Sequence, residues 1–137
     1  MSQEIRLAPD GERAVQEAQN YCFRANVSIV AAEHLLAGAL AVLSADGTPG
    51  IPAREAVEAA LMLAQGTGDV MPDNQVMFGS AARDAINATA RTVAEAGQST
   101  IDAATLALGT IDSGEVNPMF YSSLGTTRTE LRAAVAG

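Results

Sequence analysis

Lysine is absent from this sequence, and all eight of its basic residues are arginines. A Walker A loop needs a lysine to reach the β- and γ-phosphates of a nucleotide, and Schiff-base catalysis needs a lysine amine. The chain is therefore neither a P-loop ATPase nor a pyridoxal-phosphate enzyme. Acidic residues number sixteen, which gives a net charge of −8 and opposes binding to nucleic acids and anionic membranes.

Cysteine and histidine each occur once. A lone cysteine cannot form an internal disulfide, which fits a reducing cytosol. Structural zinc usually takes four Cys or His ligands, so we expect no metal and no other cofactor. The N-terminus lacks a basic or apolar leader, and the apolar segment 29–43 is too short to cross a bilayer and carries Glu33 and His34. We expect a soluble, cytoplasmic protein with no nucleic-acid or membrane partner.

Aromatic residues are scarce at 4%, tryptophan is missing, and alanine fills 28 of the 137 positions. This composition favours helices in close contact over a sheet of β-branched and aromatic residues. No segment shows the sustained alternation of apolar and polar residues that marks a half-buried strand. A chain of this length is the size of one domain. The sequence therefore predicts an all-α fold.

Residues 30–40 return in degenerate form at 101–111, which is 71 positions further on. The same offset matches Leu7 with Phe78 without a gap, mostly through shared apolar and small positions rather than identities. Each copy of such a repeat is a supersecondary unit that packs on its sibling. We predict two pseudo-symmetric four-helix-type repeats packed as a single compact domain. Repeat one covers about 7–65, a linker about 66–77, and repeat two about 78–136.

Helical spacing and cap residues place the individual elements. The expected helices cover about 10–25, 30–44, 52–66, 80–97, 101–112, 117–124 and 127–136. The expected caps are Pro52 at a first helical position, Ser80 at an N-cap, a capping-box-like start from Ser99 with Asp102, and a capping box from Thr127 with Glu130. Gly66, Gly97 and Gly125 suit helix ends.

The stretch Val30-Ala-Ala-Glu-His-Leu-Leu-Ala-Gly-Ala-Leu40 carries a Glu-His-Leu-Leu element, and Phe78-Gly-Ser-Ala-Ala-Arg83 opens the second copy with an aromatic residue. Leu124-Gly125 followed by Thr129-Glu-Leu-Arg132 closes that copy. In these elements and their order the sequence resembles the N-terminal domain of Clp ATPases, the double Clp-N repeat. The resemblance covers about Leu7 to Ala136. Because no ATPase module follows Gly137, we expect a stand-alone Clp-N protein.

The resemblance implies a non-enzymatic module that recognises substrates or adaptors for an unfoldase–protease. In some members the glutamate of each repeat helps recognise phosphoarginine, and in some actinobacterial members the surface near the copy-two aromatic binds cyclic peptides. The glutamate is present as Glu33 in copy one but is Ala104 in copy two. The threonine expected after each opening aromatic is Ala8 and Gly79. We therefore expect copy one to retain at most half of the phosphoarginine chemistry.

The candidate partner-binding or peptide-binding residues are Glu33, Phe78, Leu7 and Ser80. Leu7 and Phe78 hold the opening position of each copy, and Ser80 offers a substitute hydroxyl in copy two. Glu33 has two interpretations. Its carboxylate can be structural, since the helix dipole stabilises a negative charge in the first turn of a helix by roughly 0.3–1 kcal/mol. It can also form a bidentate pair with a guanidinium on a partner.

His34 and Cys22 are the remaining chemically distinctive residues. On an apolar helix, His34 is expected to be packed and hydrogen-bonded across the helix start. Cys22 could form a dyad with it only if the fold brought them together, and no orienting group or oxyanion donor is evident. We expect Cys22 to be a small buried hydrophobe and the protein to have no catalytic residues.

Phe78, Met77 and Met71 lie at or near the start of copy two and also have two interpretations. They can pack in the core between the halves, or they can form an exposed, adaptable apolar patch that binds peptides. The predicted function is an accessory, adaptor-like or substrate-recognition factor whose partners are Clp ATPase or protease components or their substrates. The alternative is a sequestering protein that binds a cyclic peptide or other small ligand aimed at Clp ATPases.

Overall fold

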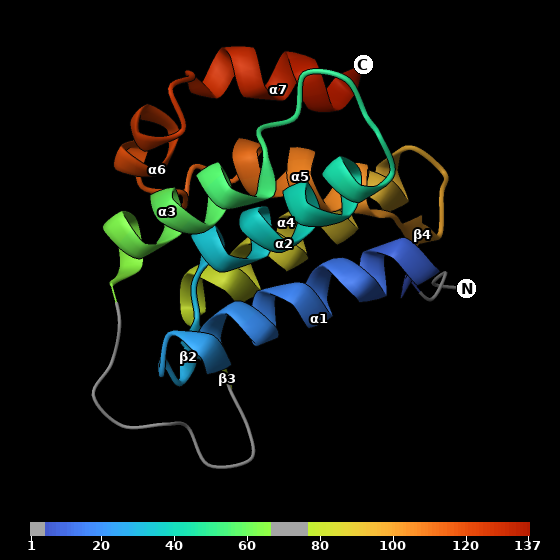
Figure 1. The fold of residues 1–137 in the computed structure, drawn as a ribbon. Helices are drawn as coiled ribbons and strands as arrows, with labels where there is room; N and C mark the ends of the chain where they lie inside the picture. Colours follow the sequence, from blue (N-terminus) through green and yellow to red (C-terminus); the bar gives the residue numbers. More distant parts are fainter. Residues whose placement is uncertain (1–4, 67–76) are drawn as a thin grey trace.

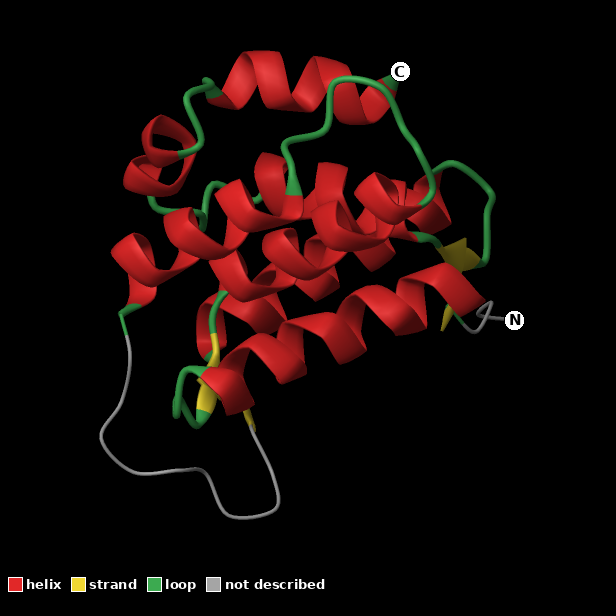
Figure 2. Ribbon diagram, in the orientation of Figure 1, coloured by secondary structure: helices red, strands yellow, loops and turns green. Residues whose placement is uncertain are grey.

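The computed structural model describes residues 5–66 and 77–137, which form seven helices and four two-residue strands (Figures 1 and 2). The helices are α1 (Pro9–Arg24), α2 (Ala32–Ala45), α3 (Arg54–Gln65), α4 (Ser80–Glu95), α5 (Ala103–Asp112), α6 (Pro118–Ser123) and α7 (Arg128–Ala136). The strands are β1 (Arg6–Leu7), β2 (Ile29–Val30), β3 (Met77–Phe78) and β4 (Thr100–Ile101). The all-α prediction is confirmed.

The repeat offset of 71 holds in three dimensions. The order β1, α1, β2, α2 recurs as β3, α4, β4, α5, and each element of the second series begins 71 residues after its counterpart. The equivalent helices α1 and α4 also begin in the same way, each after an extended residue that provides no side-chain cap. That residue is Ala8 for α1 and Gly79 for α4. The degenerate sequence pattern therefore marks a repeated unit of structure.

Each short strand pairs with a strand of the other copy. β1 pairs in parallel with β4, and β2 pairs in parallel with β3, so each copy contributes one strand to each two-stranded sheet. The hydrogen bonds are reciprocal: the Ala8 N–H donates to the Ile101 carbonyl at 2.9 Å, and the Gly79 N–H donates to the Val30 carbonyl at 2.9 Å. Two residues are too few to show a period of two, so these strands left no signal in the sequence.

A glycine stands at the equivalent crossing point of each helix pair. A Cβ at Gly38 in α2 would overlap the carbonyl oxygen of Ala14 in α1, and a Cβ at Gly109 in α5 would overlap the side chain of Thr89 in α4. The two glycines are 71 residues apart, and so are Ala18, whose backbone N a Cβ at Gly38 would also approach, and Thr89. Small residues at these positions let the helix axes approach closely, which is the packing that an alanine-rich sequence favours.

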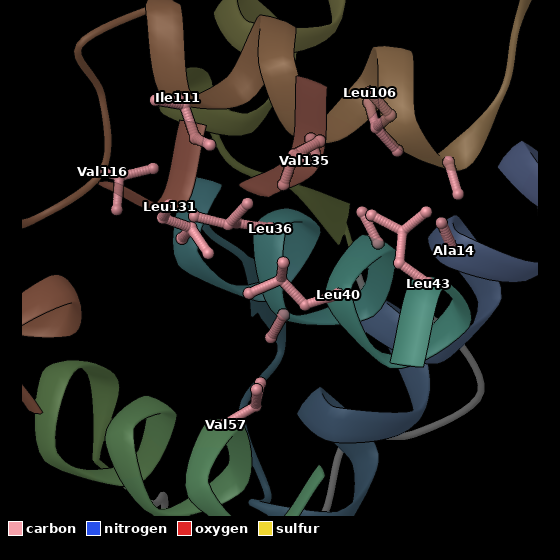
Figure 3. Close-up of a cluster of buried hydrophobic side chains, with 14 of the residues drawn as sticks. Ala14, Leu36, Leu40, Leu43, Val57, Leu106, Ile111, Val116, Leu131 and Val135 are labelled. Carbon is pink, nitrogen blue, oxygen red and sulfur yellow. The ribbon is translucent and has the colours of Figure 1, made fainter. Parts of the chain in front are cut away.

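The central element is α2, whose residues 32–43 are all buried. It contacts α1, α3 and α5. A helix that is apolar all round belongs inside a protein rather than at its surface, which accounts for the uninterrupted apolar run in the sequence. Leu36 and Leu40 of α2 point into a core that also receives Val57 of α3 and Leu131 of α7 (Figure 3).

The two copies differ after their second helix. The second copy has all four expected helices, ending in α6 and α7, whereas the described part of the first copy has three. No helix forms between α2 and α3, because residues 46–53 contain Gly47, Pro49, Gly50 and Pro52. Gly47 and Gly50 adopt φ near +79°, which a helix cannot continue through.

Some cap predictions are confirmed and others need correction. Thr127 Oγ1 accepts from the Glu130 N–H at 3.1 Å, and Gly66, Gly97 and Gly125 have positive φ at helix ends, as predicted. Ser80 is the first residue of α4 rather than its N-cap, because the extended N-cap residue is Gly79. Pro52 precedes α3, which begins at Arg54.

The start of α5 also differs from expectation. Its N-cap is Asp102 itself, whose Oδ1 accepts from the Thr105 N–H at 2.8 Å, and Ser99 lies outside the helix. Between them, Thr100 and Ile101 are held extended by β4, which prevents a helix from starting at Ser99. Met77 belongs to β3 rather than to the linker, and residues 67–76 of that linker lie outside the described residues.

Candidate functional site

An open apolar hollow of about 320 Å³ lies where the two copies meet. It is lined by Ile5, Arg6, Leu7, Val15, Phe78, Ile86, Ala90, Ile101 and Leu106. Leu7 and Ile101 lie opposite each other in the β1–β4 pair, while the other wall comes from α1, α4 and the end of β3. Arg6 is the one charged lining residue and is exposed at the edge.

The lining includes residues related by the repeat. Leu7 is equivalent to Phe78, and Val15 is equivalent to Ile86, because each pair is 71 residues apart. Since both members of each pair reach the same hollow, it lies on the pseudo-two-fold axis between the copies. All four side chains are half-buried, so solvent reaches their apolar surface. Preformed apolar surface of this kind is the usual lining of a ligand or peptide site.

The structure brings together two of the four sequence-predicted site residues. Leu7 and Phe78 line the hollow, whereas Ser80 is exposed at the start of α4 and Glu33 lies elsewhere. Phe78 has both of the roles considered for it, core packing and an accessible apolar surface. It packs against buried residues such as Val30 and also lines the hollow.

The methionines near Phe78 are only partly described. Met77 is 71% exposed beside its register partner Ile29, which is 55% exposed. The two side chains extend the apolar surface along the β2–β3 pair. Met71 lies outside the described residues.

Glu33 is buried at the start of α2 with 4% of its surface exposed. Its Oε1 accepts a hydrogen bond of 2.7 Å from Nε2 of Gln65, at the end of α3. The carboxylate is thus used inside the molecule to join two helices, from the first turn where the helix dipole also favours it. In this arrangement it is not presented to a guanidinium at the surface.

His34 closes the first turn of α2, as expected. Its Nδ1 accepts from the N–H of the N-cap residue Ala31 at 2.9 Å, as the side chain at the third helical position does in a capping box. The side chain is 1% exposed, and burial lowers the pKa of His34 to about 4. The imidazole is therefore neutral at physiological pH.

Cys22 does not form a dyad with His34. Its Sγ is 3.8 Å from the Ile29 carbonyl, to which the thiol donates, and its surroundings are apolar side chains such as Ala18 and Leu35. Burial raises the pKa of the Cys22 thiol to about 12, which keeps it protonated and unreactive. Cys22 is a small buried hydrophobe, as predicted.

Ion pairs on the surface tie the helices to one another. Arg54 of α3 contacts Glu17 of α1 at 3.0 Å, and Arg132 of α7 binds both carboxylate oxygens of Asp112 at 2.7 and 2.9 Å. The hydrogen bond from Arg132 lowers the pKa of Asp112. Exposed pairs of this kind contribute little to stability.

Within residues 5–66 and 77–137, no group of three or more His, Cys, Asp or Glu side chains is arranged to hold a metal ion. No helix in the same ranges is long and apolar enough to cross a membrane. The apolar lining of the hollow suits the burial of apolar groups.

Sequence reasoning found Leu7 and Phe78 but missed their neighbours. Val15 and Ile86 were visible as a repeat-related apolar pair, and that pairing is a signal of position near the two-fold axis. The β1–β4 pairing, which brings Ile101 and the residue before β1, Ile5, to the hollow, left no such signal. A smaller cavity beside His34 was also missed, because residues from three helices form it.

This protein resembles known proteins in its three-dimensional structure but has no match by sequence. No protein-family model and no curated protein matches the sequence. The solved structures with a similar fold include the N-terminal domain of the caseinolytic protease-associated chaperone ClpD from Arabidopsis thaliana, with a TM-score of 0.77 and 18% identity over 96% of this chain and 95% of that one. Another is the Hsp104 N-terminal domain from Candida albicans, with a TM-score of 0.71 and 9% identity over 95% of this chain and 89% of that one. The chain therefore has the fold of the N-terminal domains of ClpD and Hsp104, as its sequence pattern predicted.

Proposed function

We propose that this protein is a non-enzymatic interaction module that binds an apolar segment of a partner protein in the hollow between its two copies. The observation that carries the proposal is the convergence of Leu7, Phe78, Val15 and Ile86 on one open apolar surface. Cys22 and His34, the chain's only thiol and imidazole, each form a hydrogen bond with a backbone group, the Ile29 carbonyl and the Ala31 N–H respectively, which supports binding rather than catalysis.

The fold supports a narrower proposal. Its similarity to the N-terminal domain of a protease-associated chaperone favours a role beside a Clp unfoldase–protease. The single cysteine, which cannot form an internal disulfide, makes the cytoplasm the proposed location. There the protein would act as an accessory, adaptor-like or substrate-recognition factor. Its partners would be Clp ATPase or protease components, or the substrates delivered to them.

The hollow would bind by burying an apolar side chain of the partner. Removing a large apolar side chain from water stabilises a complex by about 1.5–3 kcal/mol. The exposed Met77 and Ile29 can extend the contact beyond the hollow, and methionine adapts to different shapes. A net charge of −8 favours a partner with basic residues around the apolar anchor, since complementary charge speeds association.

Phosphoarginine recognition forms no part of this proposal. Glu33 is committed to Gln65, and the equivalent position in the second copy is Ala104. The threonines that would hold the phosphate are also replaced, by Ala8 and Gly79.

The test is affinity capture from a lysate of the host with three immobilised proteins: wild type, Phe78→Ala and Met119→Ala. Met119 is 52% exposed in α6 and does not line the hollow, so its variant is a matched loss of exposed apolar surface. We expect wild type and Met119→Ala to recover Clp subunits, and Phe78→Ala to recover at least about tenfold less, as the loss of an apolar anchor predicts.

Equal recovery by all three proteins would contradict the hollow as the binding surface. Absence of Clp subunits from every eluate, even after cross-linking, would contradict the Clp role. The alternative function, sequestration of a cyclic peptide or other small ligand, would then gain weight, since a volume of about 320 Å³ lies in the usual range for small-molecule pockets. Calorimetric titration with such a peptide would test it.

A further inference from the structure

A second cavity, of about 130 Å³, lies between the end of α1, the start of α2 and the last turns of α3. Tyr21 and Ala25 form the α1 wall, His34 forms the α2 wall, and Leu61 with Met62 forms the α3 wall. None of these residues lines the hollow between the copies. The two cavities are therefore separate sites.

One fixed hydrogen-bond donor remains available on the wall of this cavity. His34 Nδ1 accepts from the Ala31 N–H at 2.9 Å, and the imidazole is neutral, so its single proton must be on Nε2. No described residue accepts a hydrogen bond from Nε2, although the side chain is only 1% exposed. The Nε2–H can therefore donate to a group placed in the cavity, and a hydrogen bond of this kind contributes about 0.5–1.5 kcal/mol.

The charged groups around the cavity are paired with each other, whereas the hydroxyl of Tyr21, another lining residue, has no hydrogen-bond partner among the described residues. The Arg24 guanidinium lies over the Tyr21 ring at 4.8 Å and contacts Glu58 at 3.7 Å. Both charged side chains are partly exposed, so they mark the mouth of the cavity rather than its interior. The cavity thus offers apolar walls, the imidazole donor and the Tyr21 hydroxyl, with no unpaired charge to receive an ion.

We propose that this cavity binds a neutral ring carrying one hydrogen-bond acceptor, as in a small phenol or a tyrosyl side chain, with the acceptor oxygen bonded to the Nε2–H of His34. The volume of about 130 Å³ is close to the ~150 Å³ of an engineered cavity that holds benzene, and the cavity is open at its mouth, where a ring substituent can extend. The apolar walls would contact the ring. The inference stands independently of the function proposed for the hollow between the copies.

The experiment uses the full chain and p-cresol, which is the tyrosine side chain as a free molecule. His34 is the only histidine in the sequence, so its imidazole gives the only histidine side-chain signals in nitrogen-15 NMR, and these report directly on the site. We expect p-cresol to shift the Nε2–H resonance saturably. Toluene, which has the same ring and no acceptor, is expected to bind about tenfold more weakly, as the loss of one hydrogen bond predicts.

Two leucine substitutions provide the matched pair. Ala25→Leu adds volume inside the cavity, whereas Ala96→Leu makes the same change at the repeat-equivalent position, where Ala96 ends α4 as Ala25 ends α1. We expect Ala25→Leu to abolish the shift and Ala96→Leu to retain it. The comparison of p-cresol with toluene needs no variant, so it tests the proposal even if a substitution unfolds the chain.

Three results would overturn the proposal: an unchanged Nε2–H resonance in saturating p-cresol, equal binding of toluene and p-cresol, or an unchanged response in a folded Ala25→Leu variant. The first would mean that the donor is satisfied by water alone. Given binding of p-cresol, N-acetyltyrosinamide distinguishes the source of the ligand. Its binding at the same resonance would assign the site to a peptide-borne tyrosine, and its failure would assign the site to a free small molecule.

Discussion

At the scale of the residue, the polar pair Glu33–His34 shows how a sequence signal for a site can instead be structural. Both side chains are buried at the start of α2, and each has an internal partner, Gln65 for Glu33 and the Ala31 N–H for His34. The second copy caps its equivalent helix with Asp102 instead. The two copies thus satisfy the same helix start with different side chains.

The burial of His34 predicts a pH dependence of stability. Its folded pKa of about 4 lies below the unfolded value near 6.5, so the unfolded state binds more protons in this window. The contribution is complete above pH 6.5 and is lost as the pH falls toward 4, with about 2 kcal/mol lost between pH 7 and pH 5. Urea unfolding at both pH values measures this loss.

The control for this prediction is His34→Gln, which keeps an acceptor for the Ala31 N–H, as glutamine does in a capping box. It removes the only imidazole, so the difference between wild type and variant isolates the histidine from carboxylates that also titrate. An equal loss of stability in both proteins would show that His34 does not carry the effect.

Tyr21 and Tyr121 carry buried hydroxyl groups without a hydrogen-bond partner among the described residues. Burial raises the pKa of both phenols, which therefore stay neutral. Replacing Tyr21 with Phe keeps the ring under Arg24 and removes the unpaired hydroxyl. We expect Tyr21→Phe and Tyr121→Phe each to raise the free energy of unfolding by about 1 kcal/mol in denaturant titration. A decrease of that size would reveal a hydrogen bond to water or ligand that the hydroxyl makes in solution.

At the scale of the element, the two glycines at the helix crossings control how closely the helix pairs approach. We expect Gly38→Ala and Gly109→Ala each to lower the free energy of unfolding by about 1–3 kcal/mol, because each added Cβ overlaps the facing helix. The Gly38 variant should lose more, since its Cβ meets backbone atoms of Ala14 and Ala18, whereas that of Gly109 meets the Thr89 side chain.

The sign of the change makes the glycine experiment decisive. In an exposed helix the same substitution stabilises by up to about 1 kcal/mol through helix propensity. Thermal or urea unfolding that shows stabilisation in either variant would therefore contradict close contact at that crossing.

At the scale of the whole molecule, we propose that the two copies form one cooperative domain. Each two-stranded sheet takes one strand from each copy, and the main core cluster includes α2 and α3 of the first copy with α5 and α7 of the second. Unfolding one copy would therefore expose the core of the other.

This arrangement predicts a single unfolding transition. Gly38→Ala perturbs the first copy and Gly109→Ala the second, yet both should shift the same transition when it is followed by circular dichroism and by calorimetry. Two transitions, of which each variant shifts only one, would show that the copies are independent domains.

Local sequence determined the elements that local forces control. The alanine-rich composition and apolar spacing gave the helices, and the capping box at Thr127 and the glycines after α3, α4 and α6 gave several of their ends. The starts of α2 and α5 lie about two residues later than predicted, because β2 and β4, which pair with the other copy, hold the chain extended there. Such pairing joins residues far apart in the sequence.

The repeat offset alone was enough to place Leu7 and Phe78 at equivalent positions, and the missing lysines alone excluded nucleotide hydrolysis by a P-loop. Only the tertiary structure decided that Leu7 and Phe78 share a hollow with Val15 and Ile86, and that Glu33 turns inward to Gln65. The physical reason is the range of the forces involved. Composition and periodicity act within a helix, whereas burial, cavities and the partner of a buried polar group depend on which distant elements pack together.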